Sequence, residues 1–425
     1  MDSAPAITCR VCGGAATVSF VDLGAAPPCE AFLPPGGSEA PETHYPLHVR
    51  VCPQCLLVQL PECLPAEEIF TDVYPYFSSF SDSWVEHARR YASTMTERLG
   101  LGAGSLVVEV ASNDGYLLQH FAGAGIPVLG VEPTANTAAA AREKWVRTEV
   151  CFLGEDTARG LVERYGRADL VTANNVYAHV PDLRDFTLGL ATLLADDGTL
   201  TIEVQHLARL IEHGQYDTIY HEHFQYYTLL TLQRALALGG LEVVDVEELP
   251  THGGSLRVHA QHAEHVAATG RTPSAQVEQV LALEEERGLH TVEGHRGFAE
   301  TVARVKDELL TFLLTARRKG RTVVGYGAPG KGNTLLNHCG IRSDLVQFTV
   351  DRNPHKHGTF LPGSRIPVHP VEALDEARPD YVLVLPWNLR AEISAQLHHV
   401  AAWGGRLVFA IPELDVVEPD LGASA

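Results

Sequence analysis

Three features that many proteins have are missing from this 425-residue sequence, and each absence argues against a class of protein. No apolar run approaches the roughly 20 residues of a membrane-spanning helix, and the N-terminus lacks the basic and then apolar pattern of a signal peptide. Basic residues number 32 against 53 acidic ones, so the chain lacks the basic footprint of a nucleic-acid-binding protein. We therefore expect a cytoplasmic protein that binds neither membranes nor nucleic acids.

Cysteine is also scarce, since eight residues in so long a chain do not make a disulfide scaffold. Four of them form two CxxC pairs, Cys9 with Cys12 and Cys52 with Cys55. Two such pairs can place four thiolates around one Zn²⁺, and this closed shell leaves no open position for catalysis. We expect a structural zinc here, with redox or incidental thiols as the alternative. The other four are interpreted as core or surface thiols: Cys29, Cys63, Cys151 and Cys339.

The length of the chain predicts more than one domain, because 425 residues exceed one ordinary hydrophobic core. Residues 1–69 are rich in proline, glycine and cysteine, and so small a module needs a metal to stabilise it. Residues 70–270 alternate strands with helices, which is typical of a parallel sheet with crossover helices. Residues 271–425 begin with connector helices and continue with a second such series. The predicted fold is therefore α/β.

Two further patterns lie where these domains meet. Leu241–Val246 and Ser255–Ala260 flank the turn-like residues 251–254, which predicts an antiparallel pair that closes the first large sheet. Farther on, apolar residues recur every three or four positions, as on one face of a helix: Phe298, Val302, Val305, Leu309 and Phe312. We expect this helix to be a connector and a packing face between the two α/β domains.

A cofactor site is predicted at the start of the first α/β series. Val107–Gly115 (VVEVASNDG) reads as a strand that runs into a polar turn, and Leu129–Pro133 reads as a second strand that ends in a carboxylate. Amides of the following helix can face a carboxylate of the cofactor, and Glu132 is placed to bind ribose hydroxyls. Ala111 replaces the first glycine of the usual pattern, and alone the stretch fits any nucleotide-binding turn. The predicted cofactor-binding residues are Glu109, Ala111, Asn113, Asp114, Gly115, Glu132, Pro133, Asn174 and Asn175.

A second nucleotide-type loop opens the C-terminal series. Gly325–Gly330 is GxGxxG after a strand, and Asp351 follows about twenty residues later, as in a dinucleotide fingerprint. Lys331 adds a cation beside the helix start, which favours a pyrophosphate. That group can belong to NAD or to a nucleotide-linked substrate. A tight turn without any ligand is the third interpretation.

The residues with the most chemistry are Tyr220-His221-Glu222-His223, each of which can hold or move a proton. In an extended segment Tyr220 and Glu222 would share one face and the two histidines the other. A histidine titrates near neutral pH, and a carboxylate beside it can raise its basicity. Such groups suit removal of a proton from a carbon next to a carbonyl. The alternative is a structural histidine-rich strand, although burial of four titratable residues is costly.

Several motifs, taken in order, resemble those of a known family, the zinc-containing C-methyltransferases that use S-adenosylmethionine (SAM) to branch nucleotide-linked keto-deoxysugars. The match spans essentially the whole chain and includes CRVCG, CPQC, VYPYFSSFS (residues 73–81), EVASNDG, NNVYAH, YHEH, HGGSLR and GYGAPGKGNTLLN. The resemblance implies a class I SAM methyltransferase domain in the middle. It also implies a Rossmann-like C-terminal domain that binds the sugar nucleotide rather than NAD.

The resemblance also assigns roles to residues. It implies His223 as the base, with Tyr220 and Glu222 assisting, and it implies that Tyr76 and His179 line the sugar pocket. The residues expected to bind the substrate are Ser79, His252, Gly253, Arg257, Tyr326, Gly327, Ala328, Lys331, Asn333 and Asn353. Gly330 and His338 depart from the family's pattern, so the reaction type is better supported than the identity of the sugar.

These features together predict a SAM-dependent C-methyltransferase of branched deoxysugar or antibiotic biosynthesis. We expect proton loss beside the ketone of a dTDP-4-keto-deoxysugar, at C-3 rather than C-5, and methylation of the enolate carbon. The alternatives are an NAD-dependent oxidoreductase that uses residues 325–330, a C-methyltransferase of a non-sugar substrate, and a zinc-stabilised binding protein. The sequence does not determine the oligomeric state, and a monomer is compatible with it.

Overall fold

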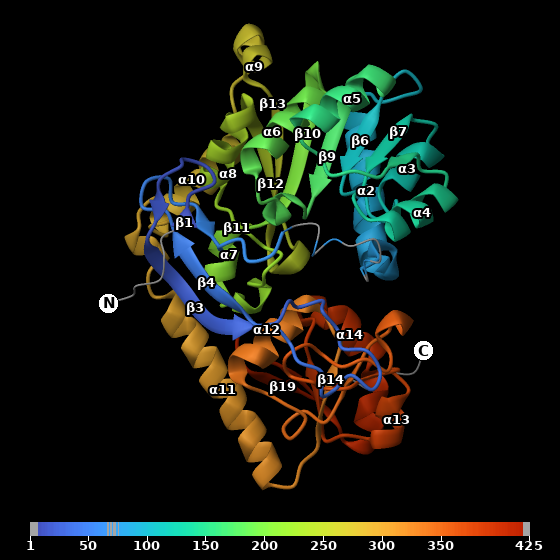
Figure 1. Cartoon of the computed structure of the whole chain (residues 1–425), viewed down its shortest axis with the longest axis vertical. Helices are drawn as coiled ribbons and strands as arrows, with labels where there is room; N and C mark the ends of the chain where they lie inside the picture. The colour runs from blue at the N-terminus through green and yellow to red at the C-terminus, as the bar shows by residue number, and fades with distance from the viewer. Residues whose placement is uncertain (1–6, 66–67, 69, 71–73, 75, 420–425) are drawn as a thin grey trace.

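The structure is a computed structural model that describes residues 7–65, 68, 70, 74 and 76–419. Val73 and Pro75 of the VYPYFSSFS motif lie outside the described residues. Two α/β domains lie at opposite ends of the molecule, and the N-terminal sheet lies along one side of it (Figure 1). Among the helices that the structure describes, none is long and apolar enough to cross a membrane.

The N-terminal residues form a hairpin and an antiparallel sheet that carry the two CxxC turns. The first turn joins the two strands of the hairpin, and the second joins β4 to β5. The last strand of this sheet, β11, comes from the middle of the chain and begins two residues after His223. The strands are β1 (Ile7–Thr8), β2 (Ala15–Ala16), β3 (Val18–Ala26), β4 (Tyr45–Val51), β5 (Val58–Gln59) and β11 (Gln225–Tyr226).

The middle of the chain forms a seven-stranded sheet of order β12-β13-β10-β9-β6-β7-β8. Five strands are parallel, and the expected antiparallel pair, β12 and β13, closes one edge. The strands are β6 (Val107–Val110), β7 (Val128–Val131), β8 (Thr148–Glu149), β9 (Ala168–Asn174), β10 (Leu194–Gln205), β12 (Leu241–Leu249) and β13 (Ser255–His262). This alternation is the class I methyltransferase arrangement that the sequence predicts.

Nine described helices accompany the strands of this part of the chain, and α2 shows local signals at both of its ends. In α2, the Ser81 side chain accepts a hydrogen bond from the Trp84 amide, and Gly100 ends the helix in the left-handed conformation (φ 63°). The helices of this part are α2 (Asp82–Leu99), α3 (Leu118–Gly123), α4 (Ala135–Glu143), α5 (Glu155–Tyr165), α6 (Leu183–Leu193), α7 (Leu207–Glu212), α8 (Leu229–Leu236), α9 (Ala263–Thr269) and α10 (Ala275–Glu286).

The C-terminal residues form a six-stranded sheet of order β16-β15-β14-β17-β18-β19, parallel except for β19. Its strands are β14 (Val323–Tyr326), β15 (Thr349–Val350), β16 (Val368–His369), β17 (Tyr381–Val384), β18 (Arg406–Phe409) and β19 (Asp415–Val417). Its helices are α11 (Phe298–Arg318), α12 (Gly330–Cys339), α13 (Ala373–Ala377) and α14 (Arg390–Gln396). Helix α12 begins inside the GxGxxG loop.

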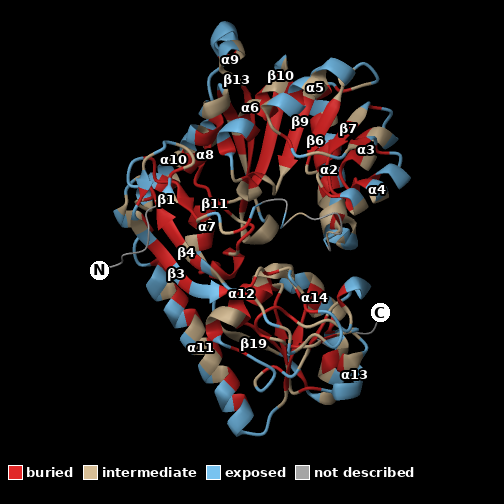
Figure 2. Ribbon diagram, viewed as in Figure 1, coloured by how far each residue is buried: buried red, intermediate tan, exposed pale blue. Residues whose placement is uncertain are grey.

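The expected apolar stripe is the buried face of α11, with one correction. Phe298 stacks on Phe20 of the N-terminal sheet with ring centroids 4.7 Å apart. The fifth buried position is Leu313 rather than Phe312, which is half-buried with its ring edge against Tyr381. Figure 2 shows the alternation of buried and exposed faces along this helix.

The N-terminal sheet shares its core with both neighbours. Apolar side chains such as Phe20 and Val49 are buried in one cluster with α11 and the six-stranded sheet. Cys9, Cys52 and Leu57 are buried in the cluster of the seven-stranded sheet. Because apolar burial is the dominant favourable term in folding, the N-terminal residues hold the two α/β domains together.

Candidate active site

A cavity of about 740 Å³ lies where the three parts of the chain meet. Its walls come from the ends of β6, β7 and β9, from residues 218–227, and from loops of the C-terminal sheet. Because ligands of open α/β sheets bind at the carboxyl ends of the strands, this is where a cofactor and a substrate would meet.

The structure places many of the predicted residues on this cavity and others behind it. Those that line it are Tyr76, Ala111, Asn113, Glu132, Pro133, Asn174, Asn175, His179, Tyr220, Glu222, His223, His252, Lys331 and Asn353. Those that do not line it are Ser79, Glu109, Asp114, Gly115, Gly253, Arg257, Tyr326, Gly327, Ala328 and Asn333.

The cofactor corner is built on Glu132, at the end of β7. Its carboxylate accepts hydrogen bonds from the backbone amides of Asn113 (2.8 Å) and Thr134 (3.0 Å). Ala111 and Asn113 adopt left-handed backbone conformations (φ 55° and 49°), which fold the turn after β6 back toward this carboxylate. A fixed carboxylate on the cavity wall fits the ribose hydroxyls of SAM.

Several predicted cofactor residues support this corner from behind. The Lys144 ammonium bridges the carboxylate of Asp114 (2.9 Å) and the hydroxyl of Ser79 (2.6 Å). Asn113 accepts from the Ser78 amide at 2.9 Å. Burial raises the pKa of Glu109, which lies behind the turn, well above its usual range. Ser79 and Asp114 therefore fasten the segment that carries Tyr76, and Lys144 is a residue that sequence reasoning missed.

The Tyr-His-Glu-His segment is a turn. It is not an extended strand, in which Tyr220 and Glu222 would share one face. The His223 amide donates to the Tyr220 carbonyl at 2.9 Å, and the two rings lie together with centroids 4.0 Å apart. His221 points elsewhere, with its Nε2 3.1 Å from the Tyr45 carbonyl oxygen. The turn therefore brings Tyr220 and His223 to the same side. In an extended strand these two side chains would point to opposite faces.

His223 is arranged as a neutral imidazole, and its Nε2 has no hydrogen-bond partner among the described residues. Its Nδ1 lies 2.8 Å from the carbonyl oxygen of Thr218, and because a carbonyl only accepts, Nδ1 carries the proton. The Nε2 atom is then left with its lone pair. Burial, together with His179 beside it (ring centroids 4.6 Å apart), lowers the pKa of His223 well below its usual value. At neutral pH this side chain can therefore accept a proton.

Glu222 and His179 lie 4.0 Å apart, yet they do not form an ion pair at neutral pH. Burial lowers the pKa of His179 to about 4, and burial together with the nearby Glu30 raises the pKa of Glu222 to about 8. Both groups are therefore uncharged near pH 7. The Tyr74 hydroxyl donates to Glu222 Oε2 at 3.4 Å, and the Cys29 thiol faces Oε1 at 3.8 Å.

The GxGxxG loop does not leave the start of α12 open for a diphosphate. Asp351 accepts from the Ala328 amide at 2.7 Å, and a Cβ placed on Gly330 would lie 3.2 Å from a Glu30 carboxylate oxygen. Glu30 also pairs with Lys356 at 3.5 Å. The position that a dinucleotide's pyrophosphate takes over a helix N-terminus is thus occupied by an acidic side chain of this chain. This arrangement opposes the oxidoreductase interpretation.

Lys331 is the second residue of α12, and it lies on the cavity wall. Its ammonium donates to Asn388 at 2.9 Å and lies 5.0 Å above the Trp387 ring. Burial lowers the pKa of Lys331, and the nearby Asp217 opposes this shift. The cation therefore faces the substrate side of the cavity, beside His252 and His223, whose pKa values it lowers further.

Arg257 and the other predicted residues behind the cavity have structural partners. Arg257 donates to the buried Glu203 carboxylate at 2.7 Å and lies 4.5 Å above the Tyr91 ring. Asn333 donates to the Cys29 carbonyl at 2.6 Å, and Tyr326 donates to Gln396 at 2.9 Å. The Gly253 carbonyl accepts from Gln215 at 2.8 Å. These residues could contact a ligand in the cavity only if the hydrogen bonds that hold them were broken.

Sequence reasoning missed several residues on the cavity wall. Tyr74 lies within a motif and was open to prediction, whereas Cys29, Glu30 and Lys356 stand in stretches without a recognisable pattern. Trp84 lines the cavity and stacks on Tyr116, with ring centroids 6.0 Å apart. No periodicity or spacing points to Cys29, Glu30 or Lys356, because they reach the cavity from segments far apart in the chain.

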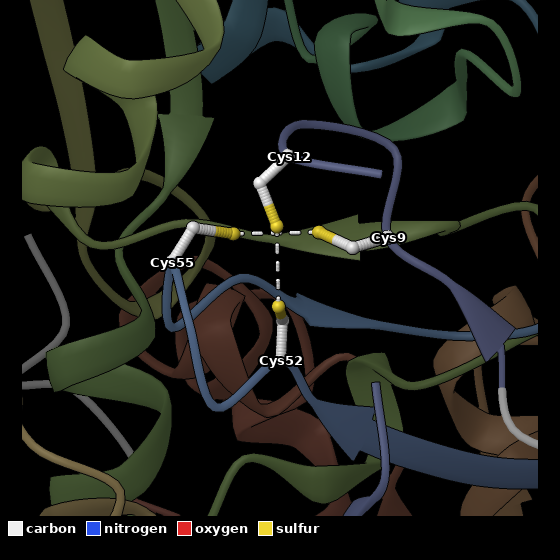
Figure 3. Close-up of side chains that lie close together, drawn as sticks. All are labelled: Cys9, Cys12, Cys52 and Cys55. Carbon is white, nitrogen blue, oxygen red and sulfur yellow. Dashed lines mark hydrogen bonds between the residues drawn. The ribbon is translucent and has the colours of Figure 1, made fainter. Parts of the chain in front are cut away.

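The four CxxC cysteines lie together, as predicted (Figure 3). All four Sγ atoms lie within 4.8 Å of one another, with Cys9 3.3 Å from Cys55 and Cys12 3.5 Å from Cys52. Four sulfurs at zinc-bonding distance in a tetrahedron are separated by about 3.8 Å, so the cluster fits a zinc ion. None of the four lines the cavity.

Comparison with known proteins identifies similar sequences over most of the chain. Three family sequence models match in turn: “Putative zinc binding domain” over residues 9–70, “Methyltransferase domain” over 84–246 and “C-methyltransferase C-terminal domain” over 250–412. The C-methyltransferase NovU of Streptomyces niveus is 36% identical over 416 residues, which cover 98% of each chain.

Two solved structures resemble part of the chain. One is a SAM-dependent methyltransferase of Clostridium acetobutylicum (TM-score 0.33, 10% identity), which covers 42% of this chain and 91% of that one. The other is the CcbJ methyltransferase of Streptomyces caelestis (TM-score 0.33, 16% identity), which covers 41% of this chain and 89% of that one.

The cysteine cluster generates the first prediction. Cys52→Ser removes one thiolate, so we expect loss of the single zinc and a lower melting temperature, because a closed thiolate shell stabilises so small a module directly. Elemental analysis and thermal melting measure the two effects. Cys63→Ser, outside the cluster, is the control and should retain the zinc. Absence of zinc from freshly purified wild-type protein would contradict the assignment.

Proposed function

The chain belongs to the SAM-dependent C-methyltransferases that carry an N-terminal zinc-binding domain, and we propose that its substrate is a dTDP-4-keto-deoxysugar. The methyl group goes to the carbon beside the ketone, C-3 rather than C-5, in the synthesis of a branched deoxysugar. The single observation that carries the proposal is His223, a neutral imidazole with a free Nε2 on the wall of a cavity shared by the cofactor corner and the C-terminal domain.

The proposed chemistry needs a base and a group that stabilises negative charge on oxygen. His223 Nε2 takes the proton from the carbon beside the ketone, since a general base must reach that hydrogen directly. Glu222, protonated at neutral pH, donates a hydrogen bond to the developing enolate oxygen. Tyr220, with its ring against His223, restricts the imidazole's orientation. SAM, when bound, supplies an activated methyl group for the nucleophilic carbon.

The residues of the cofactor corner hold SAM in this proposal. Glu132 accepts the ribose hydroxyls, and Ala111 and Asn113 line the turn beside them. Because this corner and His223 line the same cavity, the methyl donor and the sugar can be held in line. That alignment converts a reaction between two bound molecules into an effectively unimolecular step.

The C-terminal wall supports a substrate that carries a diphosphate. Lys331 and Arg352 bring cations to the cavity, and the Arg352 guanidinium is only weakly paired, 3.9 Å from Glu392. Cations of this kind bind phosphate oxygens through charge-assisted hydrogen bonds. The acidic Glu30 at the start of α12 directs a diphosphate toward these two side chains and away from the helix end.

The assignment of the methylated carbon to C-3 follows the family resemblance.

A direct assay tests the substrate and the position. Purified protein with ¹³C-methyl SAM and a dTDP-4-keto-deoxysugar should give a product whose label NMR places on C-3. Label on C-5 would revise the position. Transfer to a non-nucleotide ketone, with none to the sugar nucleotide, would contradict the proposed substrate. NAD added in place of SAM is the control and should give no change in absorbance at the wavelength of NADH.

His223→Asn tests the base. Loss of a general base typically costs about 10²–10⁴-fold in rate, so we expect kcat to fall by that much while SAM still binds. Exchange of solvent deuterium into the sugar without SAM reports the deprotonation itself and should fall in parallel. If exchange survives in His223→Asn and vanishes in Tyr220→Phe, Tyr220 is the base instead.

Glu222 predicts a pH dependence. Its raised pKa of about 8 means that the carboxyl is neutral below pH 8 and ionised above it, so kcat/KM should fall above about pH 8 as the hydrogen-bond donor is lost. Glu222→Gln, which keeps a donor but does not titrate, should lack this fall. Glu30→Gln removes the neighbouring acid and should move the fall to lower pH. A fall near pH 8 that persists in Glu222→Gln would assign it to another group.

A further inference from the structure

His179 and His223 come from different segments, and the site depends on how these segments are held together. His179 lies in a short helical turn after β9, and His223 precedes β11. The rings are 4.6 Å apart and nearly perpendicular, at 78°. For the residues that the structure describes, no hydrogen bond is found between the two side chains. Their relative position is therefore set by the backbones behind them.

Direct hydrogen bonds join the two segments. The Phe224 amide donates to the Ala178 carbonyl at 2.8 Å, and the Gln225 side chain donates to the Val180 carbonyl at 2.6 Å. The Phe224 carbonyl in turn accepts from the Leu60 amide of the N-terminal sheet, also at 2.8 Å. The histidine segments are thus attached to the sheet that carries the cysteines.

Arg10, inside the first CxxC turn, adds a further connection. Its Nε donates to the Pro181 carbonyl at 3.1 Å, and its Nη1 lies 2.8 Å from the Leu60 carbonyl and 3.4 Å from the Phe224 carbonyl. The guanidinium also lies over the Phe224 ring, 5.3 Å from its centroid. One side chain therefore contacts both histidine segments, at two residues after His179 and one residue after His223.

The base of this side chain is itself fixed. Arg10 lies between Cys9 and Cys12, and the turn is closed by hydrogen bonds from the Gly13 amide to the Cys9 carbonyl (2.9 Å) and from the Cys9 amide to the Gly14 carbonyl (2.7 Å). A zinc ion bound to the four thiolates would hold this turn further. A guanidinium on a rigid turn can hold its carbonyl partners in place.

We propose that Arg10 is a positioning residue, through which the zinc-bearing turn sets the placement of His179 and His223. The inference rests on the proposed function, because it assigns the deprotonation to His223. A misplacement of about 1 Å in a site can cost about 10²-fold in rate, so loss of this connection should reduce the chemical step. Substrate and SAM contact other residues and should bind almost as before.

Arg234 offers a matched control, because it contacts the other cysteine turn of the zinc-bearing module from outside that module. It lies on α8, and its Nη1 donates to the Cys55 carbonyl at 2.8 Å, inside the second CxxC turn. Within the part of the chain that the structure describes, its side chain has no hydrogen bond to either histidine segment. Arg234→Gln therefore removes an arginine hydrogen bond at a CxxC turn. It leaves in place the hydrogen bonds that attach the histidine segments to the N-terminal sheet.

The experiment compares Arg10→Gln, Arg10→Lys and Arg234→Gln in the full-length, zinc-loaded protein. For Arg10→Gln we expect retained zinc, KM values within about twofold, and kcat and deuterium exchange lowered by about 10–100-fold. Arg10→Lys should lie between it and wild type, because an ammonium cannot span three carbonyls as the planar guanidinium does. Arg234→Gln should lower the melting temperature and leave the exchange rate unchanged.

Two results would overturn the proposal: a wild-type exchange rate in zinc-loaded Arg10→Gln, or an equal loss of exchange in Arg234→Gln. If Arg10→Gln fails to fold, Arg10→Lys decides, and a wild-type rate in it counts against the proposal. A ¹⁵N-histidine NMR spectrum provides a readout that needs no substrate. The His179 and His223 ring signals should shift in the Arg10 variants and remain in place in Arg234→Gln, so this test holds even if the sugar substrate is wrong.

Discussion

The pairing of β11 with β5 makes two residues from the middle of the chain, Gln225 and Tyr226, part of the N-terminal sheet. The turn of residues 220–223 lies immediately before this strand, so the backbone hydrogen bonds of a sheet determine where His223 stands. The same sheet shares its buried side chains with α11 and the C-terminal domain. The cavity therefore has a defined shape because one small sheet is packed against both α/β domains at once.

Burial decides the charge state of the residues around that cavity. The loss of hydration disfavours every charged form, so it lowers the pKa of the histidines and raises that of Glu222. One physical cause thus yields a neutral base and a neutral acid side by side at neutral pH. In water, a histidine and a carboxyl 4.0 Å apart, as His179 and Glu222 are here, would form an ion pair, and Glu222 could then not donate the proposed hydrogen bond.

The GxGxxG loop illustrates how a motif can serve packing instead of a dinucleotide. Gly327 has a positive φ of 86°, and a Cβ there would lie 2.5 Å from Pro386. A Cβ on Gly325 would lie 2.6 Å from the Thr349 hydroxyl oxygen. The glycines are required by the close approach of neighbouring strands and loops, and Glu30 occupies the side where a pyrophosphate would bind. The GxGxxG pattern indicates the geometry of the turn, whereas the ligand that the turn can bind depends on the side chains that face it.

What the sequence by itself determined is local. The two CxxC spacings predicted the cysteine cluster, the alternation of strands and helices predicted the α/β sheets, and the Tyr-His-Glu-His segment was recognisable as chemistry. The cysteine cluster and the α/β sheets are confirmed, because each CxxC spacing and each strand or helix period acts over a few residues. Only the tertiary structure decided that residues 220–223 form a turn, that Glu30 faces the start of α12, and that Arg10 reaches both histidine segments. Those contacts join residues far apart in the chain, and long-range packing leaves no periodic signal in the sequence.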